Sequence, residues 1–324
     1  MENQMFCYQC EQTLGGKGCV KFGVCGKSPE VAGLQDVLIH MLKGIGFYGQ
    51  KALEQGKKID TDTHKFVMDA VFSTLTNVNF DPERFVEYIL NADKVKENLK
   101  ELAGNIEGEI PDSAKYKPPT TKEEMLADAK KVGIMTDPDL DQDIRSLREL
   151  LIYGLKGMGA YAHHAYVLGK IDESVNNFFY KGFSAVIDDS LTVDDLVKLN
   201  MELGQVNFKC MELLDSANTG AYGHPEPTEV LITKKKGPFI VVSGHDLKDL
   251  KELLEQTQDK GINIYTHGEM LPAHAYPELK KYPHLIGNYG GAWQDQQKEF
   301  DGIPGAILMT TNCLQKPRDS YKDR

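Results

Sequence analysis

Four of the six cysteines fall within the first 25 residues, and this cluster constrains the chain more than any other part of its sequence. They are spaced Cys7-x2-Cys10-x8-Cys19-x5-Cys25. Thiolates this close together usually hold a metal centre. The glycines in and beside the cluster permit left-handed turns that bring backbone amides close to a buried ion. These glycines are Gly15, Gly16, Gly18, Gly23 and Gly26. The segment 7–25 is therefore predicted to be a ligand loop.

The number and spacing of the cysteines limit what this loop can hold. A disulfide scaffold is disfavoured, because such domains are short and cysteine-dense, whereas the rest of this chain contains only Cys210 and Cys313. Zinc sites commonly present two C-x2-C pairs, and only the first pair has that spacing. The spacing also differs from the ferredoxin pattern, so the residues favour an iron–sulfur cluster but leave zinc open. Apolar neighbours are expected to shield the centre from water: Phe6, Tyr8, Val20, Phe22 and Val24.

Composition narrows the class of protein. Of the 324 residues, 41% are hydrophobic and 26% are charged, which is typical of a globular chain with several domains. The net charge of −11 disfavours a nucleic-acid partner, and the lysines at 234–236 are interpreted as a solvated turn. The sequence has no apolar run long enough for a membrane span and no signal-peptide pattern at its start. We therefore expect a cytoplasmic protein whose partners include neither nucleic acid nor membrane.

The segment from Leu34 to about Leu214 is predicted to be helical, because its apolar residues recur at the spacing of one helix face. Within it, residues 34–49 (LQDVLIHMLKGIGFYG) align with residues 147–162 (LRELLIYGLKGMGAYA). Two related helical bundles are the simplest interpretation of this repeat. The polar stretch 106–122 between them contains three prolines and is predicted to be a linker.

The pattern changes near Gly237. Short β-branched or apolar runs predict strands at 238–243, 262–266, 285–288 and 307–311. Helices are predicted at 246–258, with Asp246 as N-cap, and at about 273–281. Strands that alternate with helices imply a parallel sheet of the doubly wound, Rossmann-like type. The predicted fold is thus multidomain α and α/β, with a helical domain over 1–236 and an incomplete α/β domain over 237–324.

Functional residues of open parallel sheets gather beyond the carboxyl ends of the strands. His245 follows the first predicted strand, Glu269 follows the second, and Cys313 follows the last. Each is weak support alone, because a lone histidine is often a hydrogen-bond partner and a lone cysteine often a small core residue. A mixed nitrogen, oxygen and sulfur set at one sheet edge suits a transition-metal site better than a structural zinc site.

Several other patterns are given ordinary structural interpretations. Residues 44–49 match G-x-G-x-x-G, but no strand precedes them, so close helix packing is expected. The histidines at 163–164 are adjacent and point in different directions on a helix, so they are not expected to share an ion. Cys210 is predicted to be a core residue. His267-x-Glu269 lacks the P-C-x-x-C half of the zinc deaminase signature.

Together these segments resemble the hybrid-cluster proteins, also called prismane proteins or hydroxylamine reductases. The resemblance covers essentially the whole chain. Besides the cysteine loop, it rests on Leu147–Leu151, Ser243–Asp249, Tyr265–Pro272, Gly287–Gly291 and Thr310–Cys313. The spacing of the N-terminal cysteines is similar to that of members with a [4Fe-4S] cluster, which implies such a cluster on Cys7, Cys10, Cys19 and Cys25.

The resemblance also implies a second centre and an activity. A hybrid iron–sulfur–oxygen cluster lies between the α/β domains of the family, and His245, Glu269 and Cys313 match three of its ligands. The implied reaction is reduction of hydroxylamine to ammonia, with nitric oxide as a further proposed substrate. Electrons from a soluble donor are expected to enter at the N-terminal cluster and to pass to the hybrid cluster.

One departure from the family is large. Members are considerably longer, and their C-terminal α/β domain supplies further cysteines, one of them persulfidated, and another glutamate to the hybrid cluster. This sequence stops at Arg324, so we expect a partial chain with an incomplete ligand set and little reductase activity of its own. Two alternatives remain open: a relative of nickel–iron carbon monoxide dehydrogenases, and an electron-transfer module with one [4Fe-4S] cluster and idle residues at the second site.

Overall fold

Helix α1 (Pro29–Glu54) runs through the helical part of the protein, which the computed structural model describes over residues 4–324. The helix begins where the Ser28 side chain accepts a hydrogen bond from the Val31 amide, and Pro29 supplies a preset φ in the first turn. Most of its length is buried, because neighbouring helices cover several of its sides. These and the remaining helices are α2 (Thr61–Ser73), α3 (Pro82–Ala103), α4 (Asp112–Lys115), α5 (Lys122–Val132), α6 (Gln142–Val167), α7 (Glu173–Ala185) and α8 (Val193–Tyr222).

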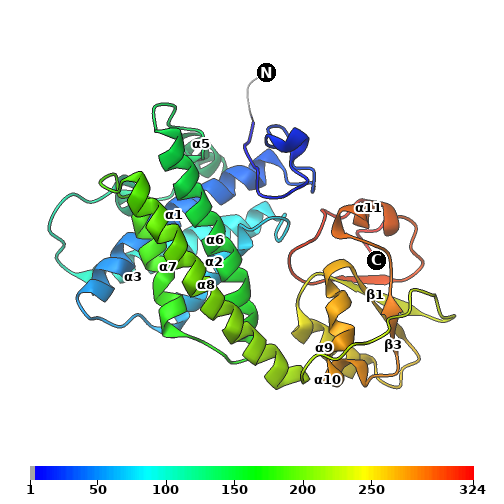
Figure 1. Ribbon diagram of the computed structural model, residues 1–324. Helices are drawn as coiled ribbons and strands as arrows, with labels where there is room; N and C mark the ends of the chain where they lie inside the picture. Colours follow the sequence, from blue (N-terminus) through cyan, green and yellow to red (C-terminus); the bar gives the residue numbers. More distant parts are fainter. Residues whose placement is uncertain (1–3) are drawn as a thin grey trace.

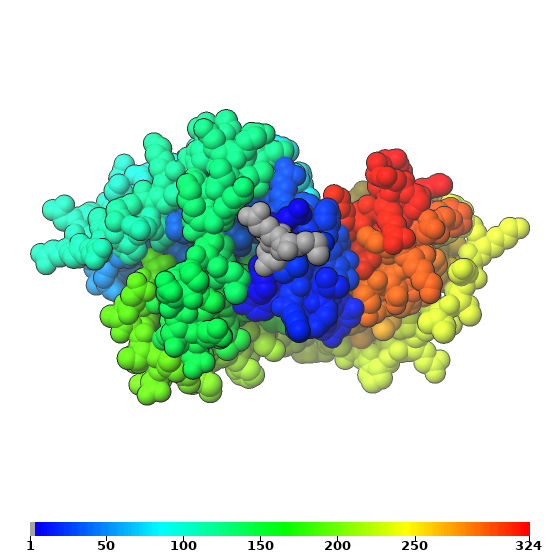
Figure 2. Space-filling model, turned by 90° about the horizontal axis from the view of Figure 1, so that it is seen from above, coloured from blue at the N-terminus to red at the C-terminus, as the bar shows by residue number. Residues whose placement is uncertain are grey.

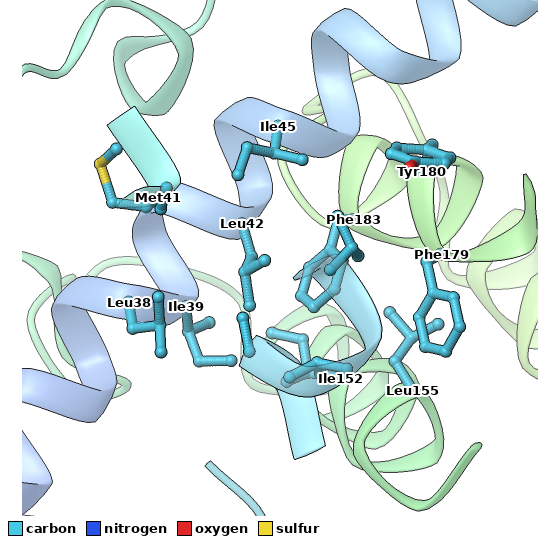
Figure 3. Close-up of a cluster of buried hydrophobic side chains, with 14 of the residues drawn as sticks. Leu38, Ile39, Met41, Leu42, Ile45, Ile152, Leu155, Phe179, Tyr180 and Phe183 are labelled. Atoms are coloured by element: carbon cyan, nitrogen blue, oxygen red, sulfur yellow. The ribbon is translucent and has the colours of Figure 1, made fainter. Parts of the chain in front are cut away.

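The predicted helical character of this part is confirmed. One buried cluster joins residues from both copies of the repeat, including Ile39 of α1 and its counterpart Ile152 of α6 (Figure 3). Because both copies contribute to the same cluster, the division into two bundles stays a prediction. The predicted linker 106–122 contains one short helix, α4, and ends where α5 begins.

The glycines at 44–49 serve helix packing, as the sequence predicted. All three lie inside α1. A methyl group on Gly44 would collide with the Ser113 carbonyl, and one on Gly49 would collide with the Tyr180 ring. The absence of side chains at these positions therefore lets α4 and α7 approach the α1 backbone closely.

The second part is built on a small parallel sheet. Its strands are β1 (Phe239–Ser243), β2 (Asn263–His267), β3 (Leu285–Asn288) and β4 (Ala306–Met309), in the order β3-β2-β1-β4. Side chains alternate between two buried clusters, with Val242 and Ile264 on one face and Val241 and Tyr265 on the other. Helix α9 (Leu247–Thr257) packs on the first face, and Asp246 caps it as predicted. The finer assignment as a Rossmann-like domain stays a prediction, as do the domain boundaries.

The predicted helix at 273–281 is wrong in its start and its continuity. A 3₁₀-helix, η2 (Gly268–Ala275), begins directly after β2, and α10 (Pro277–Lys280) follows it. Pro272 and Pro277 have no backbone N–H to donate, so a continuous α-helix through this stretch would leave carbonyl groups without partners. The remaining short elements are η1 (Leu14–Gly16), η3 (Trp293–Asp295) and α11 (Gln296–Glu299).

The helical part and the sheet part lie side by side, and α8 leads from one towards the other (Figure 1). Viewed from above, the N-terminal loop lies between the helices and the C-terminal residues (Figure 2). Within residues 4–324, no helix has both the length and the apolar character that a membrane crossing requires.

Candidate metal centres

The N-terminal cysteine loop is folded back on itself. Cys7 and Cys19 pair in a short antiparallel bridge, with N–O distances of 3.1 and 2.7 Å. Gly15, Gly16 and Gly26 take the left-handed backbone conformations that the sequence predicted. All four cysteines are free thiols, and Cys10 is close enough to Cys7, Cys19 and Cys25 for their charges to raise its pKa further, after burial.

Donors surround the sulfur atoms of this loop. Lys27 Nζ lies 3.7 Å from Cys7 Sγ, and the Thr13 hydroxyl lies 3.7 Å from Cys19 Sγ. Burial raises the pKa of Cys19, but hydrogen bonds from the backbone amides of Leu14 and Val24 outweigh this effect and lower it. Donors of this kind stabilise thiolates, which are the forms that bind metal.

The apolar shield predicted for this loop is only partly present. Phe6 and Tyr8 are half-buried, and the Tyr8 ring contacts that of Tyr153 at a centroid distance of 5.3 Å. Phe22 and Val24, however, are 58% and 44% exposed, so the expectation that they shield the centre is wrong. The alternation of Phe22 and Val24 with Gly23 and Cys25 in the sequence does not indicate this exposure.

The donor set of the loop fits a cluster. Among residues 4–324, no three His, Cys, Asp or Glu side chains converge closely enough to bind a single metal ion together. A cluster has a different requirement, because each cysteine binds its own iron atom and the sulfurs stand apart by the width of the cluster. Four free cysteines on one loop, with amide and ammonium donors to their sulfurs, meet that requirement.

The three residues predicted at the second centre lie at the carboxyl end of the sheet. β1 is a central strand, with β2 on one side and β4 on the other. The strand order therefore reverses its direction at β1. Ligands of open parallel sheets bind beside such a reversal. His245 follows β1, Glu269 lies in the first turn of η2 after β2, and Cys313 lies beyond β4.

The backbone turns sharply at each of these positions. Gly244 (φ 114°) precedes His245, and Gly268 (φ 56°) precedes Glu269. Asn312 and Cys313 themselves take positive φ values of 24° and 52°, which cost non-glycine residues energy. Strained backbone of this kind is concentrated at functional sites, so it supports the assignment of these turns to a site.

The side chains form one electrostatic group. Burial raises the pKa of Cys313 to about 12, and the Glu269 carboxylate adds to this effect. Burial lowers the pKa of His245, and Glu269 opposes that shift. The imidazole is therefore neutral at physiological pH, as a metal ligand must be. His245 Nδ1 and Asn312 Oδ1 are buried without a hydrogen-bond partner, so the site contains polar atoms that the protein alone does not satisfy. These residues fit a metal-containing group.

A buried hydrogen-bond network that the sequence gave no sign of lies beneath the site. His267 Nδ1 lies 3.0 Å from Ser243 Oγ, and His267 Nε2 lies 2.8 Å from Glu299 Oε2. Gln296 Nε2 donates to Ser243 Oγ at 2.9 Å and to the Cys313 carbonyl at 3.0 Å. Ser243 and His267 are the strand residues two positions before His245 and Glu269, so one network joins the ends of β1 and β2 to the backbone of Cys313.

Helix α6 contributes a side chain from the helical part. His164 Nε2 lies 3.4 Å from the Thr311 hydroxyl, and His164 Nδ1 lies 3.9 Å from Asp246 Oδ2. The adjacent His163 turns away and pairs with Asp69 at 2.7 Å. The expectation that the two histidines do not share an ion agrees with these separate partners. Cys210 is fully buried in α8, as predicted for a core residue.

Comparison with known proteins gives a consistent family assignment. The chain is 52% identical over 324 residues to a hydroxylamine reductase of Syntrophobacter fumaroxidans, covering 98% of this chain and 59% of the relative. It is 49% identical over 329 residues to a hydroxylamine reductase of Natranaerobius thermophilus, covering 99% of this chain and 59% of the relative.

A nickel-free carbon monoxide dehydrogenase from Thermococcus sp. AM4 aligns with 97% of this chain and 47% of its own chain, at 15% identity and a TM-score of 0.34. A similarity at this level supports no conclusion about fold or function. The chain thus spans 59% of the length of the curated relatives named above. The family profile described as "Prismane/CO dehydrogenase family" matches residues 5–324, and the chain belongs to that family.

Proposed function

We propose that this chain is part of an iron–sulfur oxidoreductase that reduces hydroxylamine to ammonia. A [4Fe-4S] cluster on the loop 7–25 would receive electrons, and a hybrid iron–sulfur–oxygen cluster on His245, Glu269 and Cys313 would bind the substrate. The remaining ligands of the hybrid cluster would come from residues outside this sequence. The observation that supports the proposal is that an imidazole, a carboxylate and a thiol follow the carboxyl ends of β1, β2 and β4, and that His245 Nδ1 is buried without a hydrogen-bond partner.

The reaction sets clear demands on the protein. Conversion of hydroxylamine to ammonia and water consumes two electrons and two protons and breaks the N–O bond. The bound clusters supply the electrons and an iron atom for the substrate. The chain's own residues hold the ligands in place: Gln296 fixes the Cys313 carbonyl, and the Ser243–His267 pair fixes the strand ends. Two further parts of the proposal are a soluble electron donor in the cytoplasm and nitric oxide as an additional substrate.

The first test is anaerobic iron and sulfide analysis with EPR on the 324-residue chain. About four irons and one reduced-cluster signal support the N-terminal [4Fe-4S] assignment and imply that the second centre needs residues beyond this sequence. About eight irons with a second set of signals imply that the second centre also assembles. No iron, or zinc in its place, contradicts the proposal, and stoichiometric nickel favours a carbon monoxide dehydrogenase relative instead.

A second test uses the full-length protein. Cys313→Ala is expected to abolish hydroxylamine reduction and to leave the EPR signal of the N-terminal cluster unchanged. Cys210→Ala is the matched control, because Cys210 is a buried thiol of α8 that contacts the Met158 carbonyl at 3.7 Å. If Cys313→Ala keeps full activity, the second site is wrong and the chain is better described as a one-cluster electron-transfer module.

A further inference from the structure

A cavity of about 750 Å³ lies inside the helical part, away from the sheet. Residues of α1 and α6 line it, together with the segments 107–113, 133–140 and 184–189. Phe6, Cys7, Gln9 and Lys27 also line it, so the cavity borders the cysteine loop. A volume in this range is typical of small-molecule sites.

The two main walls carry the same charge pattern, because α1 and α6 contain the internal repeat. Asp36 and Lys43 of α1 align with Glu149 and Lys156 of α6. In each helix the carboxylate and the ammonium are about two turns apart and face the same side. All four side chains line the cavity. The repeat therefore produces a ring of four alternating charges.

For three of the four groups, the strongest charge interaction is with the opposite charge on the other helix, but the pairs are not in contact. Lys156 is the cation with the largest effect on Asp36, and Glu149 is the carboxylate with the largest effect on Lys43. In the described part of the chain, however, no ion pair within 4.0 Å joins any two of the four. Buried charges without a contact partner are costly, so something in the cavity must satisfy them.

The burial of these groups shows in their acidities. Burial raises the pKa of Asp36 to about 7 and lowers the pKa of Lys156 to about 8. Burial likewise raises the pKa of Glu149 and lowers that of Lys43. In every case the cavity disfavours the charged form, which is the expected behaviour of groups whose partner is missing.

Further hydrogen-bond donors in the wall have no partner. Gln35 is only 4% exposed, and its Nε2 is unpaired because Lys27 binds only its Oε1, at 2.7 Å. The buried Nε atoms of Arg145 and Arg148 also lack partners. Lys156 is 7% exposed and donates one hydrogen bond, to the Thr74 carbonyl at 3.3 Å. The wall therefore has an excess of unused donors.

The buried and half-buried ionised side chains of the wall likewise carry more positive than negative charge that no contact neutralises. Arg148 is neutralised by Asp189, at 2.9 Å, whereas Arg145 donates to the Asp137 carbonyl and pairs with no carboxylate within residues 4–324. Among the buried and half-buried groups of the wall, four cations have no contacting carboxylate in the described part of the chain, namely Lys27, Lys43, Lys156 and Arg145. They face the two carboxylates Asp36 and Glu149, whereas the other unpaired carboxylates of the lining, Glu107, Glu109, Asp137 and Asp188, are exposed. A ligand that completes this site must be an anion, and it must also offer a proton to a carboxylate.

We propose that this cavity is a binding site for a small oxyanion that carries a proton, with hydrogen phosphate as the representative. Its oxygens accept hydrogen bonds from Lys43, Lys156 and the Gln35 amide. Its hydroxyl donates to Asp36 or Glu149. The site borders the candidate cluster loop through Cys7 and Lys27, but the proposal does not depend on the reaction proposed above.

The carboxylates make the site selective in a way that can be measured. Phosphate retains a proton near neutral pH, whereas sulfate of the same shape has none to donate. A site built to accept a hydrogen bond strongly rejects an analogue that lacks the donor. Water as the only occupant would show no such selectivity. We expect sulfate to bind at least about 100-fold more weakly than phosphate.

The test is isothermal titration of the purified protein, with its iron content intact, against inorganic phosphate and against sulfate. Lys156→Met and Lys43→Met are expected to lose phosphate binding. Lys100→Met is the matched control. It also removes one positive charge, but Lys100 lies on the exposed side of α3 and does not line the cavity. Thermal unfolding of each variant shows whether it is folded.

Asp36→Asn and Glu149→Gln keep the size of the side chain and replace an acceptor by a donor. They are expected to reduce the ratio of the phosphate affinity to the sulfate affinity by at least about tenfold. A purely structural role of the two carboxylates would not change this ratio. This pair keeps the proposal testable if a lysine variant fails to fold. Absence of phosphate binding, equal affinity for sulfate, or an unchanged selectivity in both carboxylate variants would overturn it.

Discussion

The backbone N–H of Lys316 donates a hydrogen bond of 2.9 Å to the carbonyl of Cys25. Lys316 lies only three residues after Cys313, so one short piece of backbone connects the two candidate centres. The next contact along this piece is the Leu314 amide, which donates to the Asn77 carbonyl at 3.2 Å. The N-terminal loop is thus held against the residues that follow the last strand.

Gly26 lies against Lys316, so a side chain added at this position would disturb the contact between the N-terminal loop and Lys316. Its φ is 97°, and a methyl group on it would lie 2.6 Å from Lys316 Cβ. Gly26→Ala is therefore expected to lower the free energy of unfolding by about 3 kcal/mol, from backbone strain and from the collision. Urea unfolding measures this change.

Gly15→Ala is the control for that measurement. Gly15 has a φ of 61°, but nothing lies within 4 Å of the added methyl group. Its cost is backbone strain alone, about 1–2 kcal/mol. Equal losses in the two variants would show that the Lys316 contact adds nothing.

Gln296 is expected to hold the second site together. It is fully buried and bonds Ser243, the Cys313 carbonyl and the Gln315 amide. Gln296→Leu removes the partner of the Cys313 carbonyl and of the Gln315 amide, and each unpaired buried group costs about 1–3 kcal/mol. We expect a loss of at least about 2 kcal/mol in urea unfolding, together with altered EPR signals of the second centre in the full-length protein. The exposed neighbour Lys298, changed to alanine, should alter neither.

His164 is expected to position the loops that carry His245 and Cys313. It touches Asp246 beside the first and Thr311 beside the second. In the full-length protein, His164→Ala should shift the EPR signals of the second centre and leave those of the N-terminal cluster unchanged. His163→Ala is the neighbouring control, because His163 pairs with Asp69 on α2. Identical spectra from both variants would contradict a positioning role.

Acid stability should depend on His40. Burial, with Lys43 and Lys96, lowers the pKa of this histidine from 6.5 to about 4. Between these two values the unfolded chain binds a proton that the folded chain does not, so stability falls as the pH is lowered through this window. The His40 contribution is at most about 3 kcal/mol.

His40→Gln removes this titration, so its stability should fall less steeply than that of the parent protein between pH 6.5 and pH 4.5. Urea unfolding at several pH values gives the two slopes. His224→Gln, at an exposed position, is the control and should follow the parent protein. Parallel slopes for His40→Gln would show that the buried histidine is not responsible.

Local patterns in the sequence were enough to locate both candidate centres. The cysteine spacing predicted the loop, and short β-branched or apolar runs predicted the strands that His245, Glu269 and Cys313 follow. These features are local in the chain or follow from the parallel arrangement of strands. The 3₁₀-helix after β2 was missed because prolines within an apolar segment do not say which helix type forms.

Contacts between residues far apart in the chain leave no local pattern in the sequence. Gln296 and Glu299 are ordinary polar residues on a single-turn helix, and nothing in their spacing links them to Ser243 or His267. The charged cavity was missed for a different reason. Asp36 and Lys43 stand within an apolar helix pattern and look like surface residues, although the repeat had already aligned them with Glu149 and Lys156.

The left-handed backbone at Cys313 limits how this position can change during evolution. Glycine would relax the backbone at residue 313 but would remove the sulfur, and most other residues would keep the strain without any compensating bond. Under the function proposed above, the bond from the Cys313 sulfur to the bound group would offset this strain. A lineage that lost this group would be expected to lose the cysteine as well, with a more stable α/β part as the result.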